Sequence, residues 1–149
     1  MGTLTLPPSG TIYVDTNSLI YFVEKVEPYL SASRPLWDEW NLGVRQLCTS
    51  ELTLLETLVK PLRTGDVSLA MLYRATLLNA AGLTCVPVSR KVLEDAATIR
   101  ALHRLSVPDA IHAATAQDTG CVLLVTNDPI FRRVPGLNVA VLDEIIASP

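Results

Sequence analysis

The stretch Thr11-Ile12-Tyr13-Val14-Asp15-Thr16-Asn17-Ser18, residues 11–18, gives the first structural signal in the chain. Its first four residues are β-branched or aromatic, which predicts a short buried strand. Polar residues that favour helix N-caps follow at once, and residues 19–26 then predict a helix. A strand that leads into a helix is the start of a β–α unit, and here it places Asp15 at the carboxyl end of the strand.

The same pattern recurs along the chain. Four further apolar stretches predict strands, at residues 47–50, 84–88, 121–125 and 138–142. Helices are expected over residues 35–46, 52–63, 67–81, 89–102 and 108–118. Strands without polar alternation, separated by helices, indicate a parallel sheet that is covered on both faces. We therefore predict one domain over residues 1–149, with a core at about 11–143, that forms an α/β/α sandwich around a mostly parallel sheet.

Length and charge exclude several classes of protein. A chain of 149 residues suits a single hydrophobic core, and no apolar run is long enough for a membrane-spanning helix. Residues 1–10 lack the basic and apolar segments of a secretory signal, so a cytoplasmic location is expected. The net charge of −3 argues against a protein that coats nucleic acid by bulk charge. It permits a local basic rim beside an acidic metal pocket.

Three widely spaced cysteines, Cys48, Cys85 and Cys121, lie in apolar surroundings. Their spacing matches no zinc motif. We therefore expect buried free thiols, without catalytic or disulfide roles.

Two carboxylates are expected at the carboxyl end of the sheet, where α/β proteins bind ligands. Asp15 follows the first predicted strand and Asp128 follows the fourth. Each alone is explained as a helix cap or turn residue. Several carboxylates at one edge would repel one another unless a cation lay between them, and Mg²⁺ prefers such oxygen ligands. The two acids together therefore indicate a metal site.

Two further acids belong to predicted helices. Asp109 follows Pro108 in a first helical turn, where a negative charge also suits the helix dipole. Glu56 lies at the margin of an apolar stripe, where a carboxylate requires a partner or a metal. The stripe consists of Leu52, Leu55, Leu58, Val59 and Leu62. Glu51 is the alternative ligand because it directly follows the second strand, and we favour Glu56.

Four motifs together resemble the PIN-domain family. They are Val14-Asp15-Thr16-Asn17, Ser50-x-Leu52-Thr53-x-x-Glu56, residues 108–116 (PDAIHAATA) and Thr126-Asn127-Asp128-x-x-Phe131. Each motif alone is weak. All four occur in the family's order, and the resemblance covers residues 12–142, with the VapC-like toxins of bacterial toxin–antitoxin pairs as the most similar group.

This resemblance implies a toxin ribonuclease that uses Mg²⁺ or Mn²⁺ to cleave single-stranded RNA. It also implies a homodimer and a small antitoxin protein as partner. By the family's pattern, the metal-binding and catalytic residues are Asp15, Glu56, Asp109 and Asp128, supported by Asn17 and Thr126.

Other residues suggest contacts with RNA or protein. Arg132 and Arg133 follow Asp128 closely enough to rim the same pocket and guide the RNA backbone, and an ordinary solvated surface is the alternative for each of them. The segments 67–81 and 36–40 carry more apolar residues than one buried face needs, so either surface could bind a partner or simply pack in the core. His112, one turn beyond Asp109, is interpreted as a packing residue that forms a local hydrogen bond.

Competing classes fit the sequence less well. A haloacid-dehalogenase-like phosphatase requires a second aspartate where this chain has Asn17, and a receiver domain requires a late lysine that is absent after Lys91. A catalytically inactive PIN-fold module that binds RNA or protein is the remaining alternative, because a fold does not fix function. The presence of all four acids favours catalysis.

Overall fold

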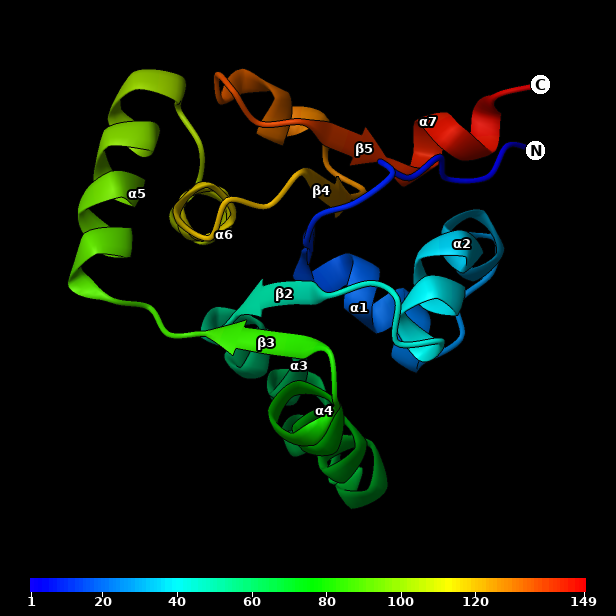
Figure 1. Cartoon of the computed structure of the whole chain (residues 1–149). Coiled ribbons are helices and arrows are strands. Elements are labelled where there is room, and N and C mark those ends of the chain that lie inside the picture. Colours follow the sequence, from blue (N-terminus) through cyan, green and yellow to red (C-terminus); the bar gives the residue numbers. More distant parts are fainter.

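The computed structural model describes residues 1–149 and has a five-stranded sheet at its centre (Figure 1). The strand order is β3-β2-β1-β4-β5, and every neighbouring pair is parallel. The strands are β1 (Ile12–Val14), β2 (Leu47–Ser50), β3 (Leu83–Val86), β4 (Leu123–Thr126) and β5 (Val139–Val141). The α-helices are α1 (Thr16–Val23), α2 (Tyr29–Asn41), α3 (Glu51–Thr64), α4 (Val67–Asn79), α5 (Arg90–His103), α6 (Val107–Asp118) and α7 (Leu142–Ala147), with a 3-10 helix η1 at Pro129–Arg133. This architecture confirms the predicted α/β/α fold with a parallel sheet.

Alternate side chains of β1 enter two separate cores. Tyr13 packs with the buried residues of α5 and α6 on one face, whereas Ile12 and Val14 pack with those of α1 and α2 on the other. Figure 1 shows α5 and α6 on one side of the sheet and α1, α2 and α7 on the other. All three β1 side chains are therefore fully buried, which explains the apolar run that predicted this strand.

The bounds of several elements are shifted by one to three residues from the sequence prediction, as in α1 and β4. Two other differences concern a proline and an unpredicted helix. Helix α2 begins at Tyr29 and contains Pro35 in its interior, although residue 35 was expected in its first turn. The proline removes one backbone hydrogen bond of the helix, while the neighbouring Leu36 and Trp37 are buried in the core. Helix α7 begins directly after β5, so Leu142 belongs to a helix and not to the predicted strand.

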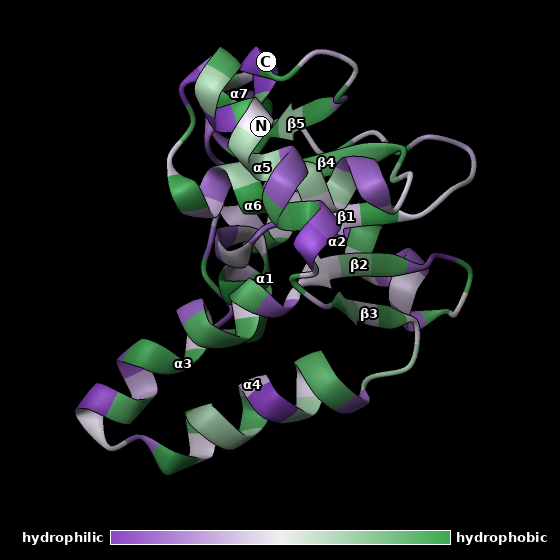
Figure 2. Cartoon of the chain, turned by 90° about the vertical axis from the view of Figure 1, so that its left-hand side faces the viewer, coloured by the Kyte–Doolittle hydropathy of each residue, from purple (hydrophilic) through white to green (hydrophobic).

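The prediction for the buried face of α3 was wrong. The buried residues are Thr53, Thr57 and Pro61, whereas three members of the predicted stripe, Leu55, Val59 and Leu62, are exposed. The threonine face is compatible with burial because the Thr57 hydroxyl donates to the Thr53 carbonyl at 2.8 Å, and the Thr53 and Thr49 hydroxyls are 2.7 Å apart. In Figure 2, α3 and α4 project from the body of the domain and carry apolar segments.

No helix combines the length and apolar character needed to cross a lipid bilayer.

Candidate active site

A polar cavity of about 200 Å³ lies beside the carboxyl end of β1. The residues that line it come from the start of α1, from α3, from α6 and from η1. They are Asp15, Thr16, Asn17, Ile20, Glu56, Asp109, His112 and Phe131. Three of the four predicted acids, together with Asn17, therefore share one cavity. The structure places Glu56 against it and leaves Glu51 exposed outside it.

Asp15 is the most buried of the acids, with 5% of its surface exposed. It is the N-cap of α1, and its Oδ1 accepts a hydrogen bond from the Ser18 amide at 2.9 Å. Its Oδ2 accepts from the Thr126 hydroxyl at 2.5 Å, which links the ends of β1 and β4. Burial raises the pKa of the Asp15 carboxyl, and the hydrogen bonds from Thr126 and Ser18 oppose that rise. A cation in the cavity would favour the ionised carboxylate and offset the free-energy cost of burying its charge.

Glu56 lies at the end of a hydrogen-bonded chain of side chains. Its Oε1 is 2.8 Å from His112 Nε2 and accepts from the Thr16 hydroxyl at 2.8 Å. On the far side of the ring, His112 Nδ1 is 2.6 Å from the Tyr13 hydroxyl. Burial alone would raise the pKa of Glu56, but the hydrogen bonds from His112 and Thr16 outweigh it, so the pKa is lowered. The chain therefore keeps Glu56 ionised.

The partners of His112 define its tautomer. An ionised Glu56 only accepts hydrogen bonds, so His112 Nε2 carries the proton and Nδ1 accepts from Tyr13. The prediction of a buried, hydrogen-bonded histidine is confirmed, with 3% of its surface exposed. Sequence reasoning missed that its partner is Glu56. The available signal was the small-residue run around position 112, which indicates a buried helix on which a histidine requires a polar partner.

Asp109 sits in the first turn of α6 and lines the cavity. Ser106 is the N-cap of α6, and its hydroxyl donates to Asp109 Oδ2 at 2.8 Å. The same hydroxyl accepts a hydrogen bond from the Asp109 amide at 3.3 Å, so Ser106 holds both the backbone and the carboxylate of Asp109 at the helix end. The other carboxylate oxygen, Oδ1, has no hydrogen-bond partner within the protein.

The structure does not bring the remaining predicted residues to the cavity wall. Asp128 is the N-cap of η1, where its Oδ1 accepts from the Ile130 amide at 2.9 Å. Asp128 is nevertheless close in sequence to the site, because it lies two residues beyond Thr126, whose hydroxyl donates to Asp15. Arg133 is exposed and forms no ion pair. Arg132 forms two hydrogen bonds of 2.5 Å to the carboxylate of Glu144.

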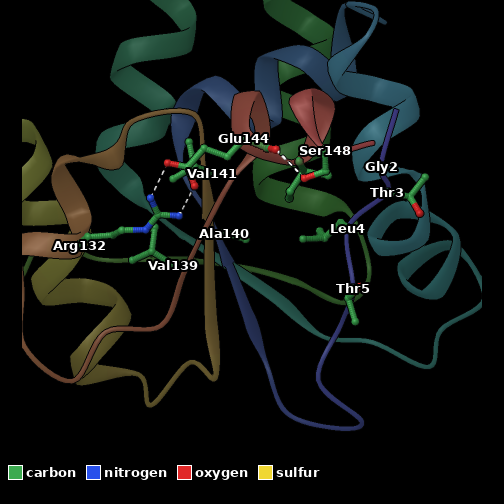
Figure 3. A pocket seen from close by; sticks show the side chains of 11 residues that line it. Gly2, Thr3, Leu4, Thr5, Arg132, Val139, Ala140, Val141, Glu144 and Ser148 are labelled. Atoms are coloured by element: carbon green, nitrogen blue, oxygen red, sulfur yellow. Dashed lines mark hydrogen bonds and ion pairs between the residues drawn. The ribbon is translucent and has the colours of Figure 1, made fainter.

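Arg132 therefore does not rim the acidic cavity as expected. It lines a separate groove with Glu144, between β5, α7 and residues 2–5 (Figure 3). The guanidinium is neutralised by Glu144, so its charge is already paired in this structure. The sequence did not indicate this ion pair, because Glu144 belongs to α7, a helix that was not predicted.

The donor set suits a hydrated hard cation. Three carboxylates and the hydroxyl of Thr16 supply oxygen atoms around a polar cavity, and Mg²⁺ commonly binds one or two carboxylates and keeps several waters. No three acidic, histidine or cysteine side chains are close enough to hold one bare ion together. The residues therefore fit an ion that retains part of its water shell.

Comparisons with known proteins identify the family and the fold of this chain. The family model described as "PIN domain" matches residues 12–137. Among solved structures, VapC20 of Mycobacterium tuberculosis, described as a sarcin-ricin loop cleaving toxin, aligns with a TM-score of 0.67 at 20% identity, over 81% of this chain and 92% of that one. DNA-bound VapBC from Salmonella typhimurium aligns with a TM-score of 0.60 at 24% identity, over 90% of this chain and 99% of that one.

VapBC2 from Rickettsia felis, solved with a promoter DNA fragment, aligns with a TM-score of 0.64 at 17% identity, over 87% of this chain and 97% of that one. At these identities the structural likeness establishes the fold. No curated protein sequence matches the chain significantly. The family match extends from the first residue of β1 to beyond η1 and includes every residue of the acidic cavity. The chain belongs to the PIN-domain family.

Proposed function

We propose that this protein is a metal-dependent endoribonuclease that cleaves single-stranded RNA and acts as the toxin of a toxin–antitoxin pair in the cytoplasm. The observation that supports this proposal most directly is the convergence of Asp15, Glu56 and Asp109 on one polar cavity. The three acids come from the start of α1, from α3 and from α6, and a purely structural role would not require them to share a cavity.

Asp15, Glu56 and Asp109 would hold a divalent ion, Mg²⁺ or Mn²⁺, with Asp128 as a fourth ligand. When bound, such an ion supplies an activated water and stabilises the leaving oxygen of a phosphodiester. The chain itself contributes orientation. Thr126 fixes Asp15 by its 2.5 Å hydrogen bond, and His112 with Thr16 fixes Glu56.

The substrate-facing groups are also part of the proposal. Asn17 is exposed and lines the cavity, so its amide is available to a phosphate or a base. Arg133 remains the proposed basic contact near Asp128. With a net charge of −3, attraction of RNA must depend on such local groups, and binding should weaken as salt rises.

The decisive test is cleavage of a labelled single-stranded RNA by the purified protein. We expect cutting with Mg²⁺ or Mn²⁺, none with a chelator, and recovery when the metal is restored. A saturating metal, at about 100 times its Kd, should also raise the melting temperature by roughly 5–10 °C. RNA cleavage that survives complete chelation would contradict the proposal.

One observation favours a second candidate, an inactive PIN-fold module that binds RNA or protein. No three potential ligands lie within reach of a single bare ion. The same experiment separates the two functions. A module of this kind would bind RNA without cutting it, and its melting temperature would not respond to Mg²⁺ or Mn²⁺.

The proposed antitoxin partner has a candidate binding surface on α3 and α4. Seven large apolar side chains there are between 43% and 69% exposed. They are Leu55, Val59, Leu62, Val67, Met71, Leu72 and Leu78. We call them the α3–α4 apolar surface. By contrast, Leu36 and Trp37 are buried, so the α2 segment packs in the core. An apolar segment of the antitoxin, or a second copy in the proposed homodimer, would bury this surface.

Co-expression with the product of a small neighbouring reading frame tests this surface. We expect that product to relieve toxicity of the parent and to fail against Leu62→Glu combined with Met71→Glu. Both side chains exceed 60% exposure, so the fold should tolerate the change. Leu102→Glu on α5, where the leucine is 70% exposed, is the matched control and should remain neutralised. Equal neutralisation of all three proteins would exclude the α3–α4 apolar surface as the docking site.

His112 should act as a positioning residue for Glu56. His112→Ala removes the Nε2 hydrogen bond of 2.8 Å, and we expect RNA cleavage and Mn²⁺ affinity to fall by roughly 10- to 100-fold. His112→Gln retains an N–H donor and should recover part of both. The measurements are cleavage rates and Mn²⁺ titration by electron paramagnetic resonance. If His112→Ala bound Mn²⁺ with unchanged affinity, His112 would have only a packing role and would not position Glu56.

A further inference from the structure

Two of the three cysteines lie against each other, although the sequence predicted buried free thiols without disulfide roles. Cys48 is the second residue of β2, and Cys121 follows α6 just before β4. Their sulfur atoms are 2.7 Å apart, although the residues are separated by 73 positions in the chain. Closing this gap to the disulfide length of about 2.05 Å would need a movement of only about 0.65 Å. Both residues are free thiols in this structure.

The two thiols differ in their exposure and in the direction in which their pKa is shifted. Cys48 is 2% exposed and packs among the core residues beneath α6, whereas Cys121 is half-buried. The hydrogen bond with Cys48 lowers the pKa of the Cys121 thiol, and burial opposes this. The same hydrogen bond, followed by burial, raises the pKa of Cys48. The Thr119 hydroxyl lies 3.2 Å from the Cys121 sulfur and provides a further polar contact.

We propose that Cys48 and Cys121 form a reversible intramolecular disulfide when a hydroperoxide oxidises the pair. Cys121 is the more accessible sulfur and reacts first, and Cys48 is held against it as the resolving thiol. The disulfide joins β2 to the turn after α6. That turn is already tied to α6, because the Cys121 amide donates to the Ala116 carbonyl at 3.1 Å.

The chemistry balances with hydrogen peroxide as the oxidant. The Cys121 thiolate attacks one peroxide oxygen, the O–O bond breaks, and the other oxygen leaves as hydroxide, which is protonated to water. Cys121 is then a sulfenic acid. The Cys48 sulfur attacks the Cys121 sulfur, the S–O bond breaks, and the hydroxyl group leaves as water with the Cys48 proton. The two thiols lose two electrons, and the peroxide is reduced to two waters.

Cys85 provides an internal control. It lies on β3 and packs with the core on the opposite face of the sheet from Cys48. Its sulfur donates to the Ser50 carbonyl at 3.6 Å and has no sulfur neighbour. The proposed disulfide should therefore form without it.

The test is to treat the whole protein with hydrogen peroxide, block remaining thiols with an alkylating reagent, and measure intact and peptide masses. We expect a loss of about 2 Da, two fewer alkylated cysteines and a Cys48–Cys121 linked peptide. The melting temperature should rise by roughly 5–10 °C, because the bond closes a long loop, and a dithiol reductant should reverse the rise.

Three variants separate the proposal from general oxidation. Cys121→Ser and Cys48→Ala should each abolish the mass loss, and Cys85→Ser should retain it. Cys48 is buried, so Cys48→Ala could misfold. The conclusion does not depend on that variant alone, because Cys121→Ser tests the same bond, and circular dichroism checks the fold of each variant. The proposal is overturned if Cys121 of the parent proceeds to a sulfinic acid without cross-linking. It is equally overturned if the linkage involves Cys85 or joins two chains.

Discussion

Replacing Asp15 with Asn should reduce RNA cleavage by roughly 10²- to 10³-fold or more, the range observed when a group that stabilises developing charge is lost. The carboxylate lies at the end of β1, faces the cavity and is fixed by Thr126 and Ser18. Asparagine is an equally good N-cap, so α1 should form normally. Cleavage rates with saturating Mn²⁺ and a fluorescent RNA measure the effect.

The stability of Asp15→Asn should change with pH in a defined direction. Burial raises the pKa of the parent carboxyl in the folded protein, so ionisation at neutral pH destabilises the folded state. In the presence of a chelator, we therefore expect the variant to be at least as stable as the parent at pH 7. The difference should vanish below about pH 4, where the carboxyl is protonated in both states. Urea unfolding at the two pH values measures it.

Asp66→Asn is the matched control for this variant. Asp66 is also a helix N-cap, accepting from the Leu69 amide at 3.0 Å, but it is exposed and lies at the start of α4, outside the cavity. The control should cleave RNA at the parental rate. If Asp15→Asn also does so, the catalytic centre lies elsewhere or the measured activity comes from a contaminant.

Asp109→Asn should produce the second large loss, again by roughly 10²- to 10³-fold. Its Oδ2 accepts a hydrogen bond from Ser106, Oδ1 is free of protein partners, and the residue lines a cavity whose proposed metal needs oxygen ligands. The amide cannot supply a second anionic oxygen, so affinity for Mn²⁺ should fall with the cleavage rate. Isothermal titration with Mn²⁺ and single-turnover cleavage measure the two effects.

The matched control lies on the same helix. Asp118→Asn makes the same chemical change at the last residue of α6, where the carboxylate pairs with Lys91 at 2.8 Å, away from the cavity. It should keep both parental cleavage and Mn²⁺ affinity, because an exposed ion pair contributes little to stability. Equal losses in the two variants would indicate a general effect on α6 instead of a metal-binding role for Asp109.

Much of the fold could be predicted because its signals are local. The strand at Ile12–Val14 is an apolar run, and α1, α3 and α5 begin after Asp15, Ser50 and Ser89, whose side chains accept hydrogen bonds from amides of the first helical turn. The buried face of α3 could not be predicted from the sequence. Periodicity identifies an apolar stripe on a helix but not which side of the helix packs against the rest of the protein. The leucines of α3 were therefore expected in the core, whereas the structure exposes them and buries Thr53.

The site depended more on tertiary structure. The sequence alone determined that Asp15 follows a buried strand and that Asp109 starts a helix. Only the strand order β3-β2-β1-β4-β5 brings β1 between β2 and β4, so that Glu56 of α3 and Thr126 of β4 reach the same end of β1. The same packing joins His112 to Glu56 and Cys48 to Cys121, pairs separated by 56 and 73 positions. Such contacts depend on how helices cross the sheet, and no local pattern of residues records that geometry.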